Sequence, residues 1–188
     1  MDYSDIYIDI LKKRYARARM IPMLSWDVFA LESRSIEGLS NGYESDRLYY
    51  DSIRLLSLAK TKNWELPINV DQELSIPGNT IVVTNLQEQI QFASVGFFEM
   101  TGYHPYEAIG KRPVELLQGK DTEPEVKQQI REAINAQEAC EATLINYRKD
   151  GEPYYCQVRI LPVFSASQEL SAFIAVEREE IGRAHVWT

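Results

Sequence analysis

Cysteine and histidine are scarce in this sequence. The 188 residues include only Cys140, Cys156, His104 and His185, and no two or three of these have the spacing of zinc ligands. The sequence therefore predicts no structural metal site. It also contains no pattern that pairs a nucleophile with a base, so it does not predict an enzyme and we expect no catalytic residues.

Long apolar runs and surplus positive charge are lacking as well. No run approaches the ~20 apolar residues of a transmembrane helix, and the first residues lack the basic start and apolar stretch of a signal peptide. We therefore expect a cytoplasmic protein with no membrane partner. The net charge of −8 does not favour nucleic-acid binding, since phosphate contacts need excess Lys and Arg.

The negative charge is concentrated in the second part of the chain. Residues 1–69 hold ten basic and ten acidic side chains, whereas residues 70–188 hold ten basic and eighteen acidic ones. This asymmetry suggests two units of different origin, which we place at residues 1–69, an N-terminal extension, and at residues 70–180, a second domain. Residues 181–188 read like the translation of a sequencing adapter, so we expect them to be an assembly scar.

The N-terminal extension has the pattern of helices. Apolar residues between 6 and 15 are interspersed with a basic run at 12–19, and Pro22 stops or kinks this segment. A second amphipathic helix is expected from Ser45 to Lys62. The apolar sides of these helices must be buried on the outer face of a sheet or against the same extension of a second chain. We expect a homodimer held partly by residues 1–69.

The basic run within this extension has two interpretations. Acidic residues precede it at positions 2, 5 and 9, which favours a solvated helix face. The alternative is a transcription regulator that contacts DNA through residues 10–20. Salt-dependent DNA binding that is lost when Lys12, Lys13 and Arg14 are removed would distinguish the two.

From about residue 79 the pattern changes to short strands. Strands are expected at 80–84, 89–93, 142–147, 153–162 and 170–178. Between the second and third of them lie short helices that end at Gly102 and Gly110, with Ser94 as an expected N-cap, and a longer helix over 123–136. This order predicts an α+β fold, a five-stranded antiparallel sheet with the helices gathered on one face.

These segments resemble the PAS domain in their residues as well as in their order. The matching stretches, within residues 78–180, are 92–103, 107–111, 116–119, 146–151 and 173–176. The resemblance implies the PAS fold and a role in signal transduction. Such a module binds a small ligand or a signalling partner protein and relays a conformational change without catalysis. Short bacterial PAS proteins often carry a helical leader of this kind.

Within that family the sequence is most similar to the flavin-binding, blue-light-sensing (LOV) branch, in which a cysteine forms an adduct with the flavin. The matching segment, residues 110–119, has no cysteine. Aligned back from Gln118, Val114 takes its place; aligned from Gly110, Pro113 does. Neither has the thiol that the adduct needs. The resemblance thus leaves open a flavin-binding photoreceptor or redox sensor that works without an adduct, and a module that needs no cofactor.

The resemblance also implies a set of pocket positions. They are Asn146, Gln118, Arg131, Cys156, Glu177 and Val114. Gln118, Asn146 and Arg131 match the branch, whereas Gln128 stands where a second arginine lies near the flavin phosphate. Cys156 replaces a second asparagine. Glu177 replaces a glutamine, and we expect it to be unable to donate the hydrogen bond that a glutamine amide gives to the flavin ring. Haem is not favoured, because the helix expected at 123–136 has no histidine.

The register of the expected hairpin bears on three of these side chains. With residues 150–152 as the loop, Asn146 lies opposite Cys156 on one face of the sheet, where it could contact a ligand or neighbouring backbone. Cys140 then lies opposite residues 160–162, about 13–20 Å from Cys156. A disulfide needs Cα atoms within ~7 Å, so we expect two free thiols.

Overall fold

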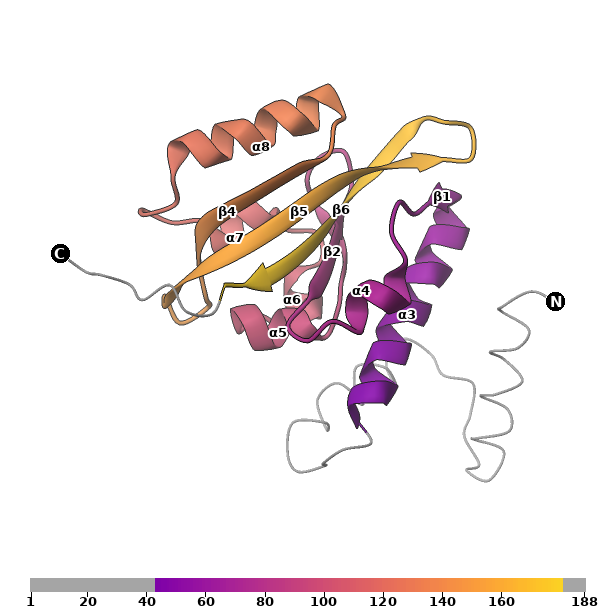
Figure 1. Ribbon diagram of the computed structural model, residues 1–188, viewed down its shortest axis with the longest axis horizontal. Helices are drawn as coiled ribbons and strands as arrows, with labels where there is room; N and C mark the ends of the chain where they lie inside the picture. Colours follow the sequence, from indigo (N-terminus) through magenta and orange to yellow (C-terminus); the bar gives the residue numbers. More distant parts are fainter. Residues whose placement is uncertain (1–42, 181–188) are drawn as a thin grey trace. The chain divides into compact units, whose positions relative to one another are not determined.

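The computed structural model describes residues 43–180 (Figure 1). The basic segment at 12–19, the DNA contacts considered at 10–20 and the suspected scar at 181–188 lie outside these residues. No helix within the described range is long and apolar enough to cross a membrane.

An antiparallel sheet forms the centre of the fold. Its strands are β1 (Trp64–Glu65), β2 (Thr80–Thr84), β3 (Ile90–Ala93), β4 (Cys140–Tyr147), β5 (Pro153–Ser165) and β6 (Leu170–Glu179). The main strands lie in the order β4-β5-β6-β2-β3, so that β6 occupies the middle of the sheet. The expected five-stranded sheet and α+β class are therefore confirmed. The additional strand β1 pairs with the end of β5 through Trp64 and Glu65.

The helices lie on both faces of this sheet. The elements α5 (Gly96–Thr101), α6 (Pro105–Ala108), α7 (Pro113–Leu117) and α8 (Pro124–Ala136) follow β3 and lie on one face, where α8 runs beside β4 (Figure 1). The elements α3 (Tyr43–Lys62) and α4 (Val70–Leu74) pack on the other face. Four of the five helices within the expected domain thus gather on one face, as predicted, whereas α4 lies with the N-terminal helix α3 on the other face.

Alternation along the strands separates the two faces. Ile81 and Val83 of β2 join Ile174 of β6 in a core with Leu55 of α3. The intervening Val82 faces the other way and packs with residues of α5, α6 and α7. This period of two is the expected geometry of a strand that is buried on both sides. The outer face of the sheet is therefore covered by α3, one of the two arrangements considered for the extension.

The hairpin between β4 and β5 has a different register from the one predicted. Asn146 pairs with Tyr154, and Leu144 pairs with Cys156. This pairing centres the loop on residue 150. Gly151 ends the turn with a positive φ of +90°, which glycine adopts readily. Asn146 and Cys156 are consequently diagonal neighbours on the same face rather than directly opposite.

Two smaller predictions about local structure are settled by hydrogen bonds and pairing. Ser94 is not the N-cap of α5. Val95 holds that position, and the Ser94 hydroxyl instead accepts a 3.0 Å hydrogen bond from the backbone N–H of Ile81. Cys140 pairs with Ile160, and both cysteines are free thiols, as expected.

Candidate functional site

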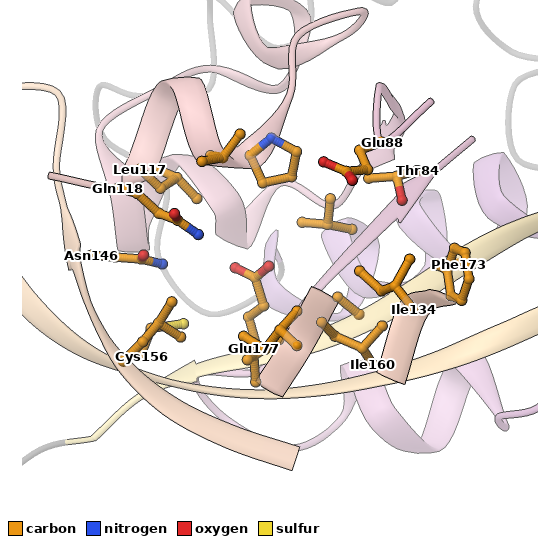
Figure 2. A pocket seen from close by; sticks show the side chains of 17 residues that line it. Thr84, Glu88, Leu117, Gln118, Ile134, Asn146, Cys156, Ile160, Phe173 and Glu177 are labelled. Atoms are coloured by element: carbon orange, nitrogen blue, oxygen red, sulfur yellow. The ribbon is translucent and has the colours of Figure 1, made fainter. Parts of the chain in front are cut away.

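A cavity of about 140 Å³ lies between the inner face of the sheet and helices α7 and α8 (Figure 2). The sheet contributes side chains from β2, β4, β5 and β6, and the helices contribute Leu117, Ile130 and Ile134. Most of the lining is apolar. The polar members are Thr84, Glu88, Gln118, Asn146, Cys156 and Glu177. A mostly apolar enclosure with a few convergent polar groups is typical of small-molecule sites.

Strand periodicity brings three of the polar side chains together. Asn146 of β4, Cys156 of β5 and Glu177 of β6 project from the same face of the sheet, and each is at least nine-tenths buried. Gln118 follows the last residue of α7 and approaches from the helical side. Figure 2 shows the amides of Gln118 and Asn146 near one another, with the Glu177 carboxyl directed into the space beside them.

Three of these side chains each have one oxygen atom that no group in the described part of the chain satisfies. Within the described residues, Oε1 of Gln118, Oδ1 of Asn146 and Oε2 of Glu177 are buried and accept no hydrogen bond. Buried polar atoms are nearly always paired in folded proteins, and an unpaired one costs about 1–3 kcal/mol. Three such atoms around one cavity indicate a place where a ligand supplies the missing partners.

The position of Gln118 is set by the loop that follows it. The N–H of Gly119 donates to Oγ1 of Thr122 at 2.9 Å, and that hydroxyl donates to the carbonyl of Ile145 at 2.6 Å. The N–H of Ile145 in turn donates to a carboxylate oxygen of Glu123 at 3.2 Å. These bonds join the loop to β4, the strand that carries Asn146, and so fix the two amides relative to each other.

Tyr147 strengthens the same junction. Its hydroxyl donates to Oδ2 of Asp121 at 2.6 Å and accepts from the N–H of Asp121 at 3.1 Å. The tyrosine ring lies so close to Gly119 that a Cβ at that position would be only 2.3 Å from it. Glycine is therefore required here by close packing of the loop against the ring.

Burial changes the acid–base properties of the cavity. It raises the pKa of Glu177 from 4.5 to about 7, since the charged form is not solvated. Burial, with the nearby Glu177 charge, also raises the pKa of the Cys156 thiol. A glutamate that is partly protonated at neutral pH can donate a hydrogen bond through its O–H. Our expectation that Glu177 cannot act as a donor applies to the ionised form only, and it stays a prediction for that form.

Five of the six positions suggested by the sequence lie at the cavity, and one does not. Asn146, Gln118, Cys156, Glu177 and Val114 are among the lining residues, with Val114 37% exposed. Arg131 lies on α8, is exposed and is not part of the lining.

Other lining residues were missed. Thr84 and Phe173 are opposite one another on β2 and β6, and strand alternation from Val82 and Ala175 could have placed both on the inner face. Glu88 lies in the turn between β2 and β3, where its carboxylate pairs with Arg112. No sequence pattern pointed to that pair, because turn residues have no fixed facing direction.

Comparison with a family of known domains places the whole lining of the cavity within one unit. A family described as "PAS domain" matches residues 78–180, more than half of the chain. This range contains every residue that lines the cavity.

Individual proteins show the same relationship. The chain is 38% identical over 97 residues to Protein TWIN LOV 1 of Arabidopsis thaliana. The aligned region covers 51% of this chain and 24% of that protein. It is 35% identical over 97 residues to a blue-light-activated histidine kinase of Brucella anthropi, covering 50% of this chain and 20% of the kinase. The matching region is thus a small part of these relatives' length.

A solved structure agrees in fold. The structure titled "Flavin Analogue Sheds Light on Light-Oxygen-Voltage Domain Mechanism" superposes with a TM-score of 0.55 at 25% identity, covering 61% of this chain and 86% of that one. The matched region in all three comparisons is a sensory domain, and the kinase activity named for the Brucella protein lies in a protein of which this chain spans only a fifth.

Proposed function

Because this chain belongs to the PAS domain family, with a blue-light-activated histidine kinase among its relatives, we propose that it is a cytoplasmic sensory module that binds a flavin ring non-covalently. The module relays the state of that ligand as a conformational change and performs no catalysis of its own. The observation that carries this proposal is the set of three buried, unpartnered polar atoms on Gln118, Asn146 and Glu177.

The residues present fit the polar edge of such a ring. The amides of Asn146 and Gln118 can each donate and accept hydrogen bonds, and the protonated carboxyl of Glu177 can donate one. A bound flavin would supply light absorption and reversible electron uptake. The protein side chains would orient the ring, and the apolar walls would exclude water from it.

No adduct is part of this proposal. Val114 and Pro113, the two residues that alignment could place at the position of the reactive cysteine, have no thiol. Cys156 lies on β5 with no exposure, and burial raises its pKa, which keeps it in the unreactive thiol form. The ligand is therefore held by shape and hydrogen bonds alone.

The size of the cavity sets a condition on binding. At about 140 Å³ it is smaller than the ~300 Å³ at the lower end of small-molecule pockets. Helix α8 forms one wall through Ile130 and Ile134, yet none of its residues is buried. Since α8 packs on the core only through partly buried residues such as Val126 and Ile130, we expect it to move outward when a tricyclic ring enters.

The cavity recognises the ring rather than a phosphate group. Its lining includes no Lys, Arg or His, and Arg131 is exposed elsewhere on α8. A phosphate would have to remain outside, in solvent. We therefore expect riboflavin and its phosphorylated form to bind with similar affinity.

The test is the colour of the purified full chain and its uptake of riboflavin, followed by quenching of flavin fluorescence. We expect Asn146→Leu to weaken binding by about 1–3 kcal/mol without loss of stability, because Oδ1 of Asn146 has no protein partner to lose. Thr143→Leu, on the same strand but outside the lining, is the matched control. A colourless protein that takes up no added riboflavin would refute the flavin proposal and favour a ligand-free interaction module.

A further inference from the structure

Glu177 is a buried carboxyl group in the lining of the cavity. It lies on β6, the middle strand, where it pairs with Thr80 of β2 and Val158 of β5. Its residue is 6% exposed, and its Oε2 accepts no hydrogen bond within the described residues. Figure 2 shows the carboxyl directed away from the sheet into the cavity. One oxygen of this carboxyl therefore has neither solvent nor a donor among the described residues.

The surrounding elements offer it no positive charge. The walls from α7 and α8 are apolar, and β4 contributes Leu144 and Asn146. The titratable neighbours on β5 are Tyr154 and Cys156, and burial raises the pKa of both, which keeps them neutral. An isolated carboxylate in such surroundings is strongly disfavoured relative to the neutral acid.

The charged groups nearby on the chain are engaged elsewhere. Arg148, which follows β4, is bound to Glu179 at 2.6 Å and to Glu152 at 3.2 Å. At the cavity mouth, Glu88 is paired with Arg112. Among the described residues that line the cavity, the charged side chains are acidic only. The cavity is thus suited to a neutral ligand edge, not to an anion.

We infer that Glu177 carries a proton inside the cavity and donates it in a hydrogen bond to an acceptor atom of a neutral ring, so that ligand and proton are bound together. This inference rests on the proposed function, in which that ring is a flavin. A glutamine at this position would donate at every pH, whereas a glutamate donates only while protonated.

The consequence is a ligand affinity that depends on pH. The pKa of Glu177 at about 7 is consistent with a proton that is held at neutral pH and released above it. Once ionised, the carboxylate only accepts hydrogen bonds and would face the acceptor atom of the ring. Because one proton is linked to binding, affinity should fall by up to about tenfold per pH unit above that pKa.

The protonation of Glu177 can be measured without any ligand. We would label the glutamate side-chain carboxyl carbons of the full chain with carbon-13 and titrate them by NMR, assigning Glu177 from the signal missing in Glu177→Gln. The expected midpoint is about 7. A midpoint near the ordinary 4.5 would overturn the inference, whatever riboflavin does.

Riboflavin then tests the coupling. Its affinity would be measured from pH 6 to 9 for the natural sequence, for Glu177→Gln, and for Glu141→Gln, an exposed glutamate of β4. We expect the affinity to fall above pH 7 in the natural chain and in Glu141→Gln but to stay constant in Glu177→Gln. An equal fall in all three, or no fall in any, would overturn the inference.

The two proposals fail in distinguishable ways. If neither the natural chain nor Glu177→Gln binds riboflavin at any pH, the flavin function is refuted, and the coupled uptake of a flavin and a proton is refuted with it. If both bind but with the same pH dependence, the flavin function stands and the role of Glu177 does not.

Discussion

The carboxylate of Asp51 on α3 accepts a 2.7 Å hydrogen bond from the backbone N–H of Val95, the N-cap residue of α5. The two residues lie 44 positions apart. N–H groups at the start of a helix have no partner within it, and Val95 has no side chain that could provide one. Asp51, which is 3% exposed, supplies the missing acceptor to the N–H of Val95 from a helix on the other side of the sheet. The outer helix thus completes an element of the inner face.

Replacing Asp51 by Ala should lower the free energy of unfolding by about 1–3 kcal/mol, because the part-buried N–H of Val95 loses its acceptor. Urea denaturation followed by circular dichroism would measure the change. Asp71→Ala is the control, since Asp71 is an exposed aspartate on α4. Equal stability of the two variants would show that the contact between α3 and α5 contributes nothing.

The contact of Gly119 with Tyr147 gives a second prediction. In Gly119→Ala the new methyl group would clash with the ring, displacing the loop that orients Gln118. We expect a loss of about 1–3 kcal/mol in stability and weaker riboflavin binding. Lys120→Ala, one residue further along and 82% exposed at its side chain, should change neither. A stable Gly119→Ala with unchanged binding would contradict the packing argument.

The sheet could be predicted because the composition of its strands and of the turns between them is distinctive. Residues 80–84 and 170–178 are rich in β-branched and apolar side chains, and turn residues bound the hairpins. The strand β1 could not be predicted, because its two residues are too few to show a periodic pattern. The hairpin register was predicted wrongly: Asn146 was expected opposite Cys156 but pairs with Tyr154. The sequence around Gly151 does not show which position of the turn the glycine occupies.

The site was harder to predict than the sheet. The resemblance led to five positions that lie at the cavity, but it also led to Arg131, whose exposure depends on how α8 rotates above the sheet. The donor capacity of Glu177 could not be foreseen, because its pKa depends on burial by residues from several elements. The contact between Asp51 and Val95 joins distant segments and leaves no local pattern.

The exposed side of α3 is the basis of a prediction about assembly. The inner side of this helix is covered by the sheet through Leu55, whereas Leu56 is 47% exposed. We propose that the expected homodimer, if it involves α3, uses this outward side. Light scattering of the full chain should give a dimer, and Leu56→Lys should shift it toward the monomer.

The matched control for this variant is Leu86→Lys. Leu86 is 49% exposed but lies in the turn between β2 and β3. A monomeric full chain at micromolar concentration would refute the dimer. Dimers of equal stability in both variants would place the contact away from Leu56.

The pH dependence of stability follows from the burial of Glu177. Its pKa is about 7 in the folded chain and near 4.5 in an unfolded one, so the folded state binds this proton more tightly. The resulting stability is fully present below about pH 4.5 and is lost as the pH rises through about 7. At about 1.4 kcal/mol per pKa unit, the loss amounts to about 3 kcal/mol. Glutamine does not titrate, so Glu177→Gln should not show this loss. Urea denaturation would measure the free energy of unfolding of both proteins. The value for Glu177→Gln minus that for the natural chain should increase by about 3 kcal/mol between pH 4.5 and pH 8. Parallel stability curves for the two proteins across this range would mean that Glu177 is ionised, and therefore solvated or paired, in the folded chain.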